Sequence, residues 1–317
     1  GLVGSEMCIE TACNPAIGGI GKGHLVKEID ALGGEMGKVA DSTGIHFRVL
    51  NASRGAATRG YRCQSDYLEY KKVMRQKLEN QTGLKILEGV AEELLVQGNQ
   101  VIGLRTNNGD YLAETVIITA GTFLNGLIHR GQDRVEAGRD SEPSVKKLSL
   151  SLCNQSLQIG RMKTGTPARL DRRSIDWSKM DVQPGDEKPK KFSFWDSEIL
   201  LPQVVCHIAY TNEKTHRIIQ DNLGRSALYG GKITGIGPRY CPSIEDKIVK
   251  FADKKRHQVF LERYQTSTTN KTLRRYVQPT ISQSFFIHLV LKPNQRASCK
   301  HILPFGPITM PLRNALD

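Results

Sequence analysis

The chain has 317 residues and a formal net charge of +13, and 38% of its residues are hydrophobic. This length is enough for two domains with separate cores, and no window approaches about 18 uninterrupted apolar residues, which excludes a predicted membrane-spanning helix. The seven cysteines form no C-x-x-C pair, so the sequence argues against a disulfide framework and favours a reducing compartment. More than half of the positive excess lies in 263–317, and the charge is compatible with a nucleic-acid partner without establishing one.

The stretch from Cys13 to His24 is rich in glycine and precedes a helical pattern that Gly33 and Gly34 close. It is no Walker A loop, because its lysine lies between two glycines and no Ser or Thr follows. A glycine-rich loop at a helix N-terminus suits a phosphate or the edge of a flavin ring. The alternative is a loop that is rich in glycine only for tight packing. The glycines concerned are Gly18, Gly19, Gly21 and Gly23.

Basic residues gather in two predicted loops, one at 50–62 and one at 161–173. Arginines beside a tyrosine suit contacts with RNA backbone and stacking on bases. A solvated charged loop explains the same pattern equally well. The candidate RNA-binding residues are Arg54, Arg59, Arg62, Lys163 and Arg169.

The middle of the chain predicts a helix at 67–78, followed by short strands at 85–90, 93–96, 101–104 and 111–112. The continuous apolar run at 115–122 is typical of a parallel strand that is buried on both faces. This order is how flavin- and nicotinamide-binding two-dinucleotide folds commonly close their first domain, which favours an α/β fold by analogy. Cys206, His207, Glu213 and His216 fit no zinc spacing, so we predict no metal site.

The stretch Gly237–Phe251 is predicted to be a constrained loop that runs into a helix. Ser243 is a natural N-cap, and Asp246 stands three residues later, as in a capping box. Cys241 then lies two residues before the helix, near the positive end of its dipole, where the pKa of a thiol is lowered. On the residues alone, a reactive thiol and an inert buried cysteine are about equally good interpretations.

Five motifs together resemble one family, that of the tRNA uridine 5-carboxymethylaminomethyl modification enzymes (MnmG, or glucose-inhibited division protein A). The resemblance runs over about 13–262, and the motifs that carry it are Cys13–Gly34, Val116–Leu124, Lys163–Pro167, Thr211–His216 and Gly237–Phe251.

The resemblance implies a Rossmann-like FAD/NAD(P)-binding α/β fold of the two-dinucleotide flavoprotein type, incomplete here, with a smaller inserted domain. It implies an enzyme that acts on tRNA with a tRNA-modifying GTPase, as a homodimer in the full-length family. The expected product carries an aminomethyl or carboxymethylaminomethyl group on carbon 5 of the wobble uridine. FAD, NADH and methylene-tetrahydrofolate are the expected cofactors, and the bacterial cytoplasm is the expected compartment, with the mitochondrion as the alternative.

The resemblance also assigns site residues. Cys241 is the first choice for a nucleophile, with Cys13 as the second cysteine that matches the family, and Val90 and Ser144 match flavin contacts. The residues expected at nicotinamide are Gly237, Pro238, Arg239, Tyr240, Pro242, Ser243, Ile244, Glu245, Asp246, Lys247 and Phe251.

Four segments are expected from the same comparison of motifs. Residues 1–12 are predicted to be an unrelated leader, and 13–200 a partial FAD-binding domain without its first strand and G-x-G-x-x-G loop. Residues 201–262 are predicted to be an inserted NAD- or substrate-binding region, and 263–317 a tail outside the family that is disordered or out of frame. Two other functions stay open: a folate-dependent tRNA uracil methyltransferase, and a non-catalytic RNA-binding fragment.

Overall fold

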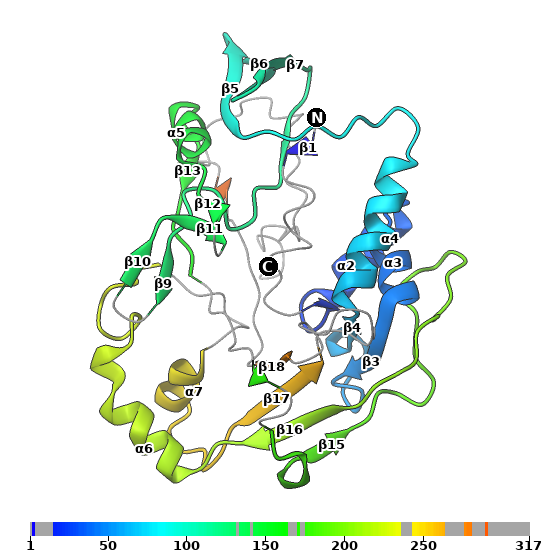
Figure 1. Ribbon diagram of the computed structural model, residues 1–317, viewed down its shortest axis with the longest axis vertical. Coiled ribbons are helices and arrows are strands. Elements are labelled where there is room, and N and C mark those ends of the chain that lie inside the picture. Colours follow the sequence, from blue (N-terminus) through cyan, green and yellow to red (C-terminus); the bar gives the residue numbers. More distant parts are fainter. Residues whose placement is uncertain are drawn as a thin grey trace. The chain divides into compact units, whose positions relative to one another are not determined.

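The computed structural model describes residues 2–3, 15–130, 133–139, 142–163, 170–171, 175–235, 243–263, 276–280 and 289–290 (Figure 1). The chain divides into two compact units. The first unit comprises Gly1–Thr11, Leu87–Met162 and Phe285–Asp317, and the second comprises Ala12–Ile86 and Lys163–Ser284.

The second unit contains a three-stranded antiparallel sheet in the order β2-β4-β3. Its strands are β2 (Ala16–Gly18), β3 (Gly44–Leu50) and β4 (Gly60–Ser65), with the 3-10 turn η1 (Ala56–Thr58) before β4. Three helices accompany this sheet: α2 (Gly23–Ala31), α3 (Met36–Thr43) and α4 (Tyr67–Glu79). The buried core between them contains Val26, Val39, Ala40, Phe47, Cys63 and Tyr70.

A five-stranded antiparallel sheet in the order β14-β18-β17-β16-β15 forms the other part of the second unit. Its strands are β14 (Leu170–Asp171), β15 (Asp181–Gln183), β16 (Cys206–Tyr210), β17 (Gln258–Arg263) and β18 (Tyr276–Thr280). Between β16 and β17 the chain forms α6 (Glu213–Asp221), η4 (Leu223–Arg225) and α7 (Ile244–Lys250), and η3 (Trp177–Lys179) precedes β15. Figure 1 shows α6 and α7 near one another beside the ends of β16 and β17.

Polar side chains tie the parts of the second unit together. Arg62 on β4 forms an ion pair with Glu262 on β17, whose side chain is fully buried. The amide of Gln64 donates to the carbonyl of Arg263 at 3.1 Å. Farther along, the carboxylate of buried Asp41 accepts the backbone N–H groups of Phe192 and Ser193 at 2.7 and 2.9 Å. Because a buried carboxylate needs such donors, these contacts fix the long 184–205 connection against the helices.

The first unit is built on a second three-stranded antiparallel sheet, β5 (Ala91–Gln97), β6 (Gln100–Thr106) and β7 (Gly109–Leu112). Leu94 of β5 packs with Val116 and with Leu152 of α5 (Lys146–Asn154) in the core. Four pairs of short strands complete the unit. They are β1 (Leu2–Val3) with β8 (Ile117–Ile118), β9 (Ile128–Arg130) with β10 (Asp133–Val135), β11 (Ala137–Arg139) with β12 (Glu142–Pro143), and β13 (Gln158–Ile159) with β19 (Leu289–Val290).

The helical pattern that ends at Gly33 is confirmed as α2, and the helix predicted at 67–78 is confirmed as α4. The strands predicted at 93–96, 101–104 and 111–112 are confirmed as β5, β6 and β7. The strand predicted at 85–90 is wrong, because these residues form no strand and β5 begins only at Ala91. The run at 115–122 contributes the two-residue strand β8, which pairs in parallel with β1. Thus β1 lies within the predicted leader, and β18 and β19 lie within the predicted tail. None of the helices in the described ranges has the length and hydropathy needed to cross a bilayer.

Candidate functional site

Helix α7 begins where the sequence predicts, with Ser243 at its N-cap. The Ser243 hydroxyl accepts the N–H of Asp246 at 3.2 Å, and the Asp246 carboxylate accepts the N–H of Ser243 at 3.3 Å, which completes a capping box. Ile248 is buried, whereas Phe251 terminates the helix and is 44% exposed, so Phe251 does not continue the buried face of α7. Of the predicted nicotinamide residues, the ones on or beside α7 are Ser243, Ile244, Glu245, Asp246, Lys247 and Phe251.

Asp246 is the centre of a polar network behind this cap. It accepts hydrogen bonds from the ammonium of Lys163 at 3.0 Å and from the hydroxyl of Tyr229 at 3.1 Å, and Lys250 pairs with it at 3.1 Å. Burial alone would raise the pKa of this carboxyl, but the hydrogen bonds and charges of the two lysines outweigh burial and lower the pKa to about 2. Burial and the neighbouring carboxylate raise the pKa of Tyr229 to about 12. The network holds a permanent anion and a neutral phenol at the start of α7.

A buried histidine pair links α6 to the strand that follows α7. Asn212 caps α6, where its side chain accepts the N–H of Thr215 at 2.9 Å. The Thr211 hydroxyl lies 2.7 Å from Nε2 of His216 and accepts the backbone N–H of His257 at 2.8 Å. The two imidazole rings lie 5.3 Å apart, and burial, followed by the charge of the neighbouring ring, lowers the pKa of His257. Sequence reasoning noticed His216 but missed His257 and Tyr229, which no local pattern distinguishes.

The three cysteines in the described residues divide into two groups. Cys63 and Cys206 are buried, and burial raises the pKa of each thiol, to about 12 for Cys206, so neither is a ready nucleophile at neutral pH. Cys153 is exposed on α5. Several predicted site residues lie outside the described residues: Cys13, Arg169, Gly237, Pro238, Arg239, Tyr240, Cys241 and Pro242.

The glycine-rich loop has the left-handed backbone that its composition predicts, with φ of 80° at Gly18, 99° at Gly19 and 75° at Gly21. Tight packing explains Gly18 and Gly23, because a Cβ at either would come within 2.8 Å of the Tyr61 backbone or closer. Gly19 is different, since a Cβ there would meet no heavy atom within 4 Å. Tight packing therefore accounts for Gly18 and Gly23, and the interpretation as a phosphate or flavin site stays a prediction. Helix α2 follows, and its N-cap residue makes no side-chain capping hydrogen bond.

The two other predicted flavin contacts lie in the first unit. Val90 is 45% exposed and precedes β5. Its N–H donates to the side chain of Asn107 at 2.7 Å and its carbonyl accepts the Asn107 N–H at 3.0 Å, so one residue holds both backbone groups. Ser144 is half-buried beside Val145, which bridges to Leu124 ahead of α5. In the described ranges, no three His, Cys, Asp or Glu side chains cluster as metal ligands.

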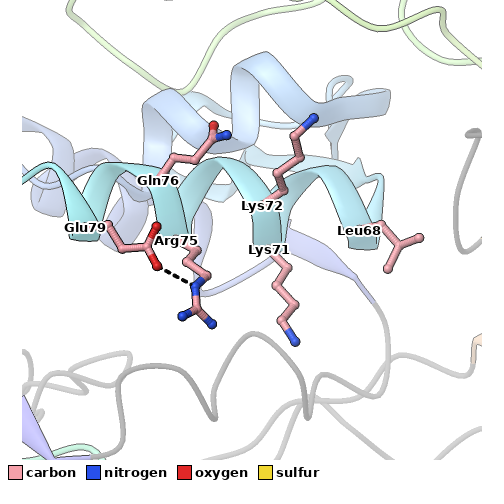
Figure 2. A pocket seen from close by; sticks show the side chains of 6 residues that line it. All are labelled: Leu68, Lys71, Lys72, Arg75, Gln76 and Glu79. Carbon is pink, nitrogen blue, oxygen red and sulfur yellow. Dashed lines mark hydrogen bonds and ion pairs between the residues drawn. The ribbon is translucent and has the colours of Figure 1, made fainter. Parts of the chain in front are cut away.

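The predicted RNA-binding residues differ in whether their charges are already paired with carboxylates. Arg54 and Arg59 lie on the exposed loop before β4, where Nε of Arg59 donates to the Arg54 carbonyl at 3.1 Å. Arg62 and Lys163 are instead engaged by buried carboxylates, which favours structural roles for both. Figure 2 shows a further basic surface, a shallow hollow along α4 lined by Leu68, Lys71, Lys72, Arg75, Gln76 and Glu79.

Comparison with known proteins identifies the relatives of this chain. The sequence model described as glucose inhibited division protein A matches residues 3–278, a range that includes the expected 13–262 and extends beyond it at both ends. A tRNA uridine 5-carboxymethylaminomethyl modification enzyme MnmG from Thermodesulfovibrio yellowstonii is 56% identical over 258 residues, which cover 81% of this chain and 41% of the relative. The protein of the same name from Aquifex aeolicus is 52% identical over 261 residues, or 80% of this chain and 42% of the relative.

The solved structures agree. Aquifex aeolicus GidA in its form I crystal superimposes with a TM-score of 0.74 at 50% identity, covering 84% of this chain and 45% of that one. The form II crystal gives a TM-score of 0.73 at 46% identity. The chain spans about two fifths of the length of the curated relatives that it matches. The predicted fold class is confirmed as the Rossmann-like FAD-binding α/β fold of these proteins, covered in part, and the chain belongs to the glucose inhibited division protein A family.

Proposed function

We propose that this chain forms part of an FAD-dependent enzyme that modifies carbon 5 of the wobble uridine in tRNA, with a (carboxymethyl)aminomethyl group as the product. Membership of the family and the names of its close relatives support the substrate class. The observation that carries the proposal for this chain is the capped helix α7 with its buried Asp246 network, which lies in the same motif as Cys241 and begins three residues after it in the sequence.

The chemistry needs a nucleophile because carbon 5 of uracil reacts poorly with electrophiles. A thiolate that adds to carbon 6 makes carbon 5 nucleophilic; after carbon 5 has bonded to the one-carbon unit it loses its proton, and the thiolate leaves. We assign this role to Cys241, with Cys13 as the second candidate. Cys63 and Cys206 are poor candidates for this role, because burial raises the pKa of each thiol.

The residues of the glycine loop fit a flavin in part. Gly19 leaves room for close approach, and α2 begins without a side-chain cap four residues later. Val90 and Ser144 are the other proposed contacts, although Asn107 already engages both backbone groups of Val90. When bound, the flavin would supply redox chemistry, and we propose that Gly237–Phe251 would hold NADH, which would serve as the source of reducing equivalents. Methylene-tetrahydrofolate is the proposed one-carbon donor.

Further proposals concern partners and organisation. A tRNA-modifying GTPase and a second copy of the full-length protein are the proposed protein partners, in the bacterial cytoplasm or alternatively the mitochondrion. We also retain as a proposal that 201–262 forms an NAD- or substrate-binding insertion in a larger FAD-binding domain. Within this segment, the hydrogen bonds that Lys163 and Tyr229 donate to Asp246 stabilise the start of α7.

The test is expression of the chain in a bacterium that lacks its own enzyme of this family, followed by mass spectrometry of tRNA nucleosides. We expect the C5-modified wobble uridine to reappear, to be lost in Cys241→Ser, and to persist in the control Cys153→Ser, which removes an exposed thiol on α5. Modification that survives Cys241→Ser removes the nucleophile assignment. A 5-methyluridine product would indicate the methyltransferase instead, and RNA binding without any product would indicate a non-catalytic RNA-binding fragment.

A further inference from the structure

The loop between α7 and β17 presents cations next to aromatic rings. We call Tyr210, Phe251, Lys254, Lys255 and Arg256 the cation–aromatic surface. The ammonium of Lys254 lies 5.2 Å from the centre of the Phe251 ring, and the guanidinium carbon of Arg256 lies 4.3 Å from the centre of the Tyr210 ring. All three cations are exposed. The guanidinium plane of Arg256 is thus held at the surface by an aromatic ring rather than by a carboxylate.

The three cations of this surface outnumber the one carboxylate of the same loop, Asp253. No described carboxylate forms an ion pair with Lys254, Lys255 or Arg256. The basic face of α4 is different: Arg75 pairs with Glu79 at 2.7 Å, as Figure 2 shows, and Lys72 lies 3.6 Å from Glu69. An anionic ligand would have to displace these paired carboxylates on α4, whereas no described carboxylate is paired with the cations of the cation–aromatic surface.

Backbone contacts fix the loop at both ends. Phe251 N–H donates to the carbonyl of Lys247 at 3.0 Å, and Lys254 N–H donates to that of Phe251 at 3.1 Å. At the other end, His257 accepts the N–H of Thr211 at 3.0 Å and donates its own N–H to the Thr211 hydroxyl at 2.8 Å. A surface held in this way loses little conformational freedom when it binds.

We infer that the cation–aromatic surface binds single-stranded RNA, with phosphates on Lys254 and Lys255 and an unpaired base stacked at Arg256 and the neighbouring rings. Aromatic rings and guanidinium planes beside lysines are the combination that unpaired nucleotides use, whereas bases in a duplex are already stacked on each other. This inference rests on the proposed function and deepens it. The surface follows the seven-residue helix α7, which is about 10 Å long. Because the cations lie within 15 residues of Cys241 in the sequence, the nucleotides bound here are proposed to flank the reacting uridine.

The test measures fluorescence anisotropy of a labelled 12-nucleotide single-stranded RNA against the full chain at several salt concentrations. The triple variant Lys254→Ala/Lys255→Ala/Arg256→Ala should bind at least about tenfold more weakly, and the slope of log affinity against log salt should shrink by about 1.4, because the two phosphate contacts of Lys254 and Lys255 are lost at about 0.7 each. The charge-matched control is Lys71→Ala/Lys72→Ala/Arg75→Ala on α4, which should leave the slope unchanged. Equal losses in the two triple variants would mean a response to net charge alone and would overturn the inference.

A second variant separates stacking from charge. Arg256→Lys keeps the positive charge but lacks the planar guanidinium, so we expect a weaker affinity for the single strand with an unchanged salt slope. A 12-base-pair RNA duplex should not distinguish Arg256→Lys from the wild type. If the duplex and the single strand respond alike, stacking of an unpaired base is excluded. These readouts need no turnover: RNA binding that depends on Lys254–Arg256 in a chain that forms no modified uridine would retain the surface and reject the proposed function.

Discussion

At the scale of single residues, burial decides which thiols can react. Cys206 is 1% exposed and its pKa is raised to about 12, so at pH 8 only about one molecule in ten thousand carries that thiolate. Cys63 is fully buried and its thiol lies 3.4 Å from the carbonyl of Ala40. These two sulfurs behave as small apolar core atoms.

We therefore predict that iodoacetamide at pH 8 labels Cys153 in the native chain and leaves Cys63 and Cys206 unlabelled over the same period. Peptide mass spectrometry measures each site separately. Labelling in guanidinium chloride is the control, and there all three should react. Labelling of Cys206 at the rate of Cys153 in the native chain would contradict this account of the core.

The sequence could not assign the roles of individual cations. Arg54, Arg59 and Arg62 are predicted alike, yet Arg62 is the one that pairs with a carboxylate 200 residues away in the chain. The partner of Lys163 is likewise 83 residues distant. Such pairs depend on how strands associate, and a local pattern carries no information on that. The sharper chemical indication for Arg256, its contact with Tyr210, also appears only in the structure.

At the scale of elements, caps were predictable because they are local. Ser243 and Asp246 stand three residues apart, and the capping box follows from that spacing. The strand predicted at 85–90 failed because apolar content alone does not form a strand without a partner, and β5 finds its partner β6 only from Ala91 onward. No local sequence pattern predicts that β17 pairs with β16 and β18, because these strands are far apart in the chain.

The ionised carboxylate at the start of α7 predicts how the free energy of unfolding depends on pH. Asp246→Asn removes the carboxylate that Lys163 and Lys250 contact and weakens the capping box, so it should lower the free energy of unfolding by roughly 1–3 kcal/mol at pH 6. The pKa of Asp246 is lowered from 3.8 to about 2 on folding, so its contribution is complete above about pH 4 and declines as the pH falls toward 2. Urea unfolding between pH 6 and pH 3, followed by tryptophan fluorescence, should show the wild type and the variant converging. A difference that stays constant over this range would contradict the role given to the ionised carboxylate.

At the scale of the whole molecule, the second unit joins both parts of the candidate site. The glycine loop follows β2, β2 pairs with β4, and Arg62 of β4 pairs with Glu262 of β17, the strand after α7. The ion pair therefore connects the sheet of the proposed flavin loop to the sheet that carries α7. Family motifs predicted the fold class, but they could not show that this buried pair is the link between the two segments.

Both tryptophans of the chain, Trp177 and Trp195, lie in the second unit, so their fluorescence reports on that unit alone. Glu262→Gln leaves the buried guanidinium of Arg62 without its counter-charge and should destabilise the unit by about 3–5 kcal/mol in urea unfolding. The matched control is Glu93→Gln, which breaks an ion pair with Arg105 that is about half exposed and lies in the first unit. It should leave the fluorescence transition unchanged, because an exposed ion pair contributes little and this one lies outside the unit that contains the tryptophans.

Replacing both partners separates a buried charge from a general need for this contact. Arg62→Met/Glu262→Leu removes both charges of this pair, so its stability should lie closer to the wild type than that of Glu262→Gln. If the double variant is as unstable as the single one, packing and not charge pairing holds the two sheets together. If Glu262→Gln unfolds at the wild-type urea concentration, the ion pair does not link them. The first result would show that apolar packing holds the sheet of the glycine loop to β17. The second would leave the hydrogen bond from Gln64 to the Arg263 carbonyl as a polar contact between β4 and β17.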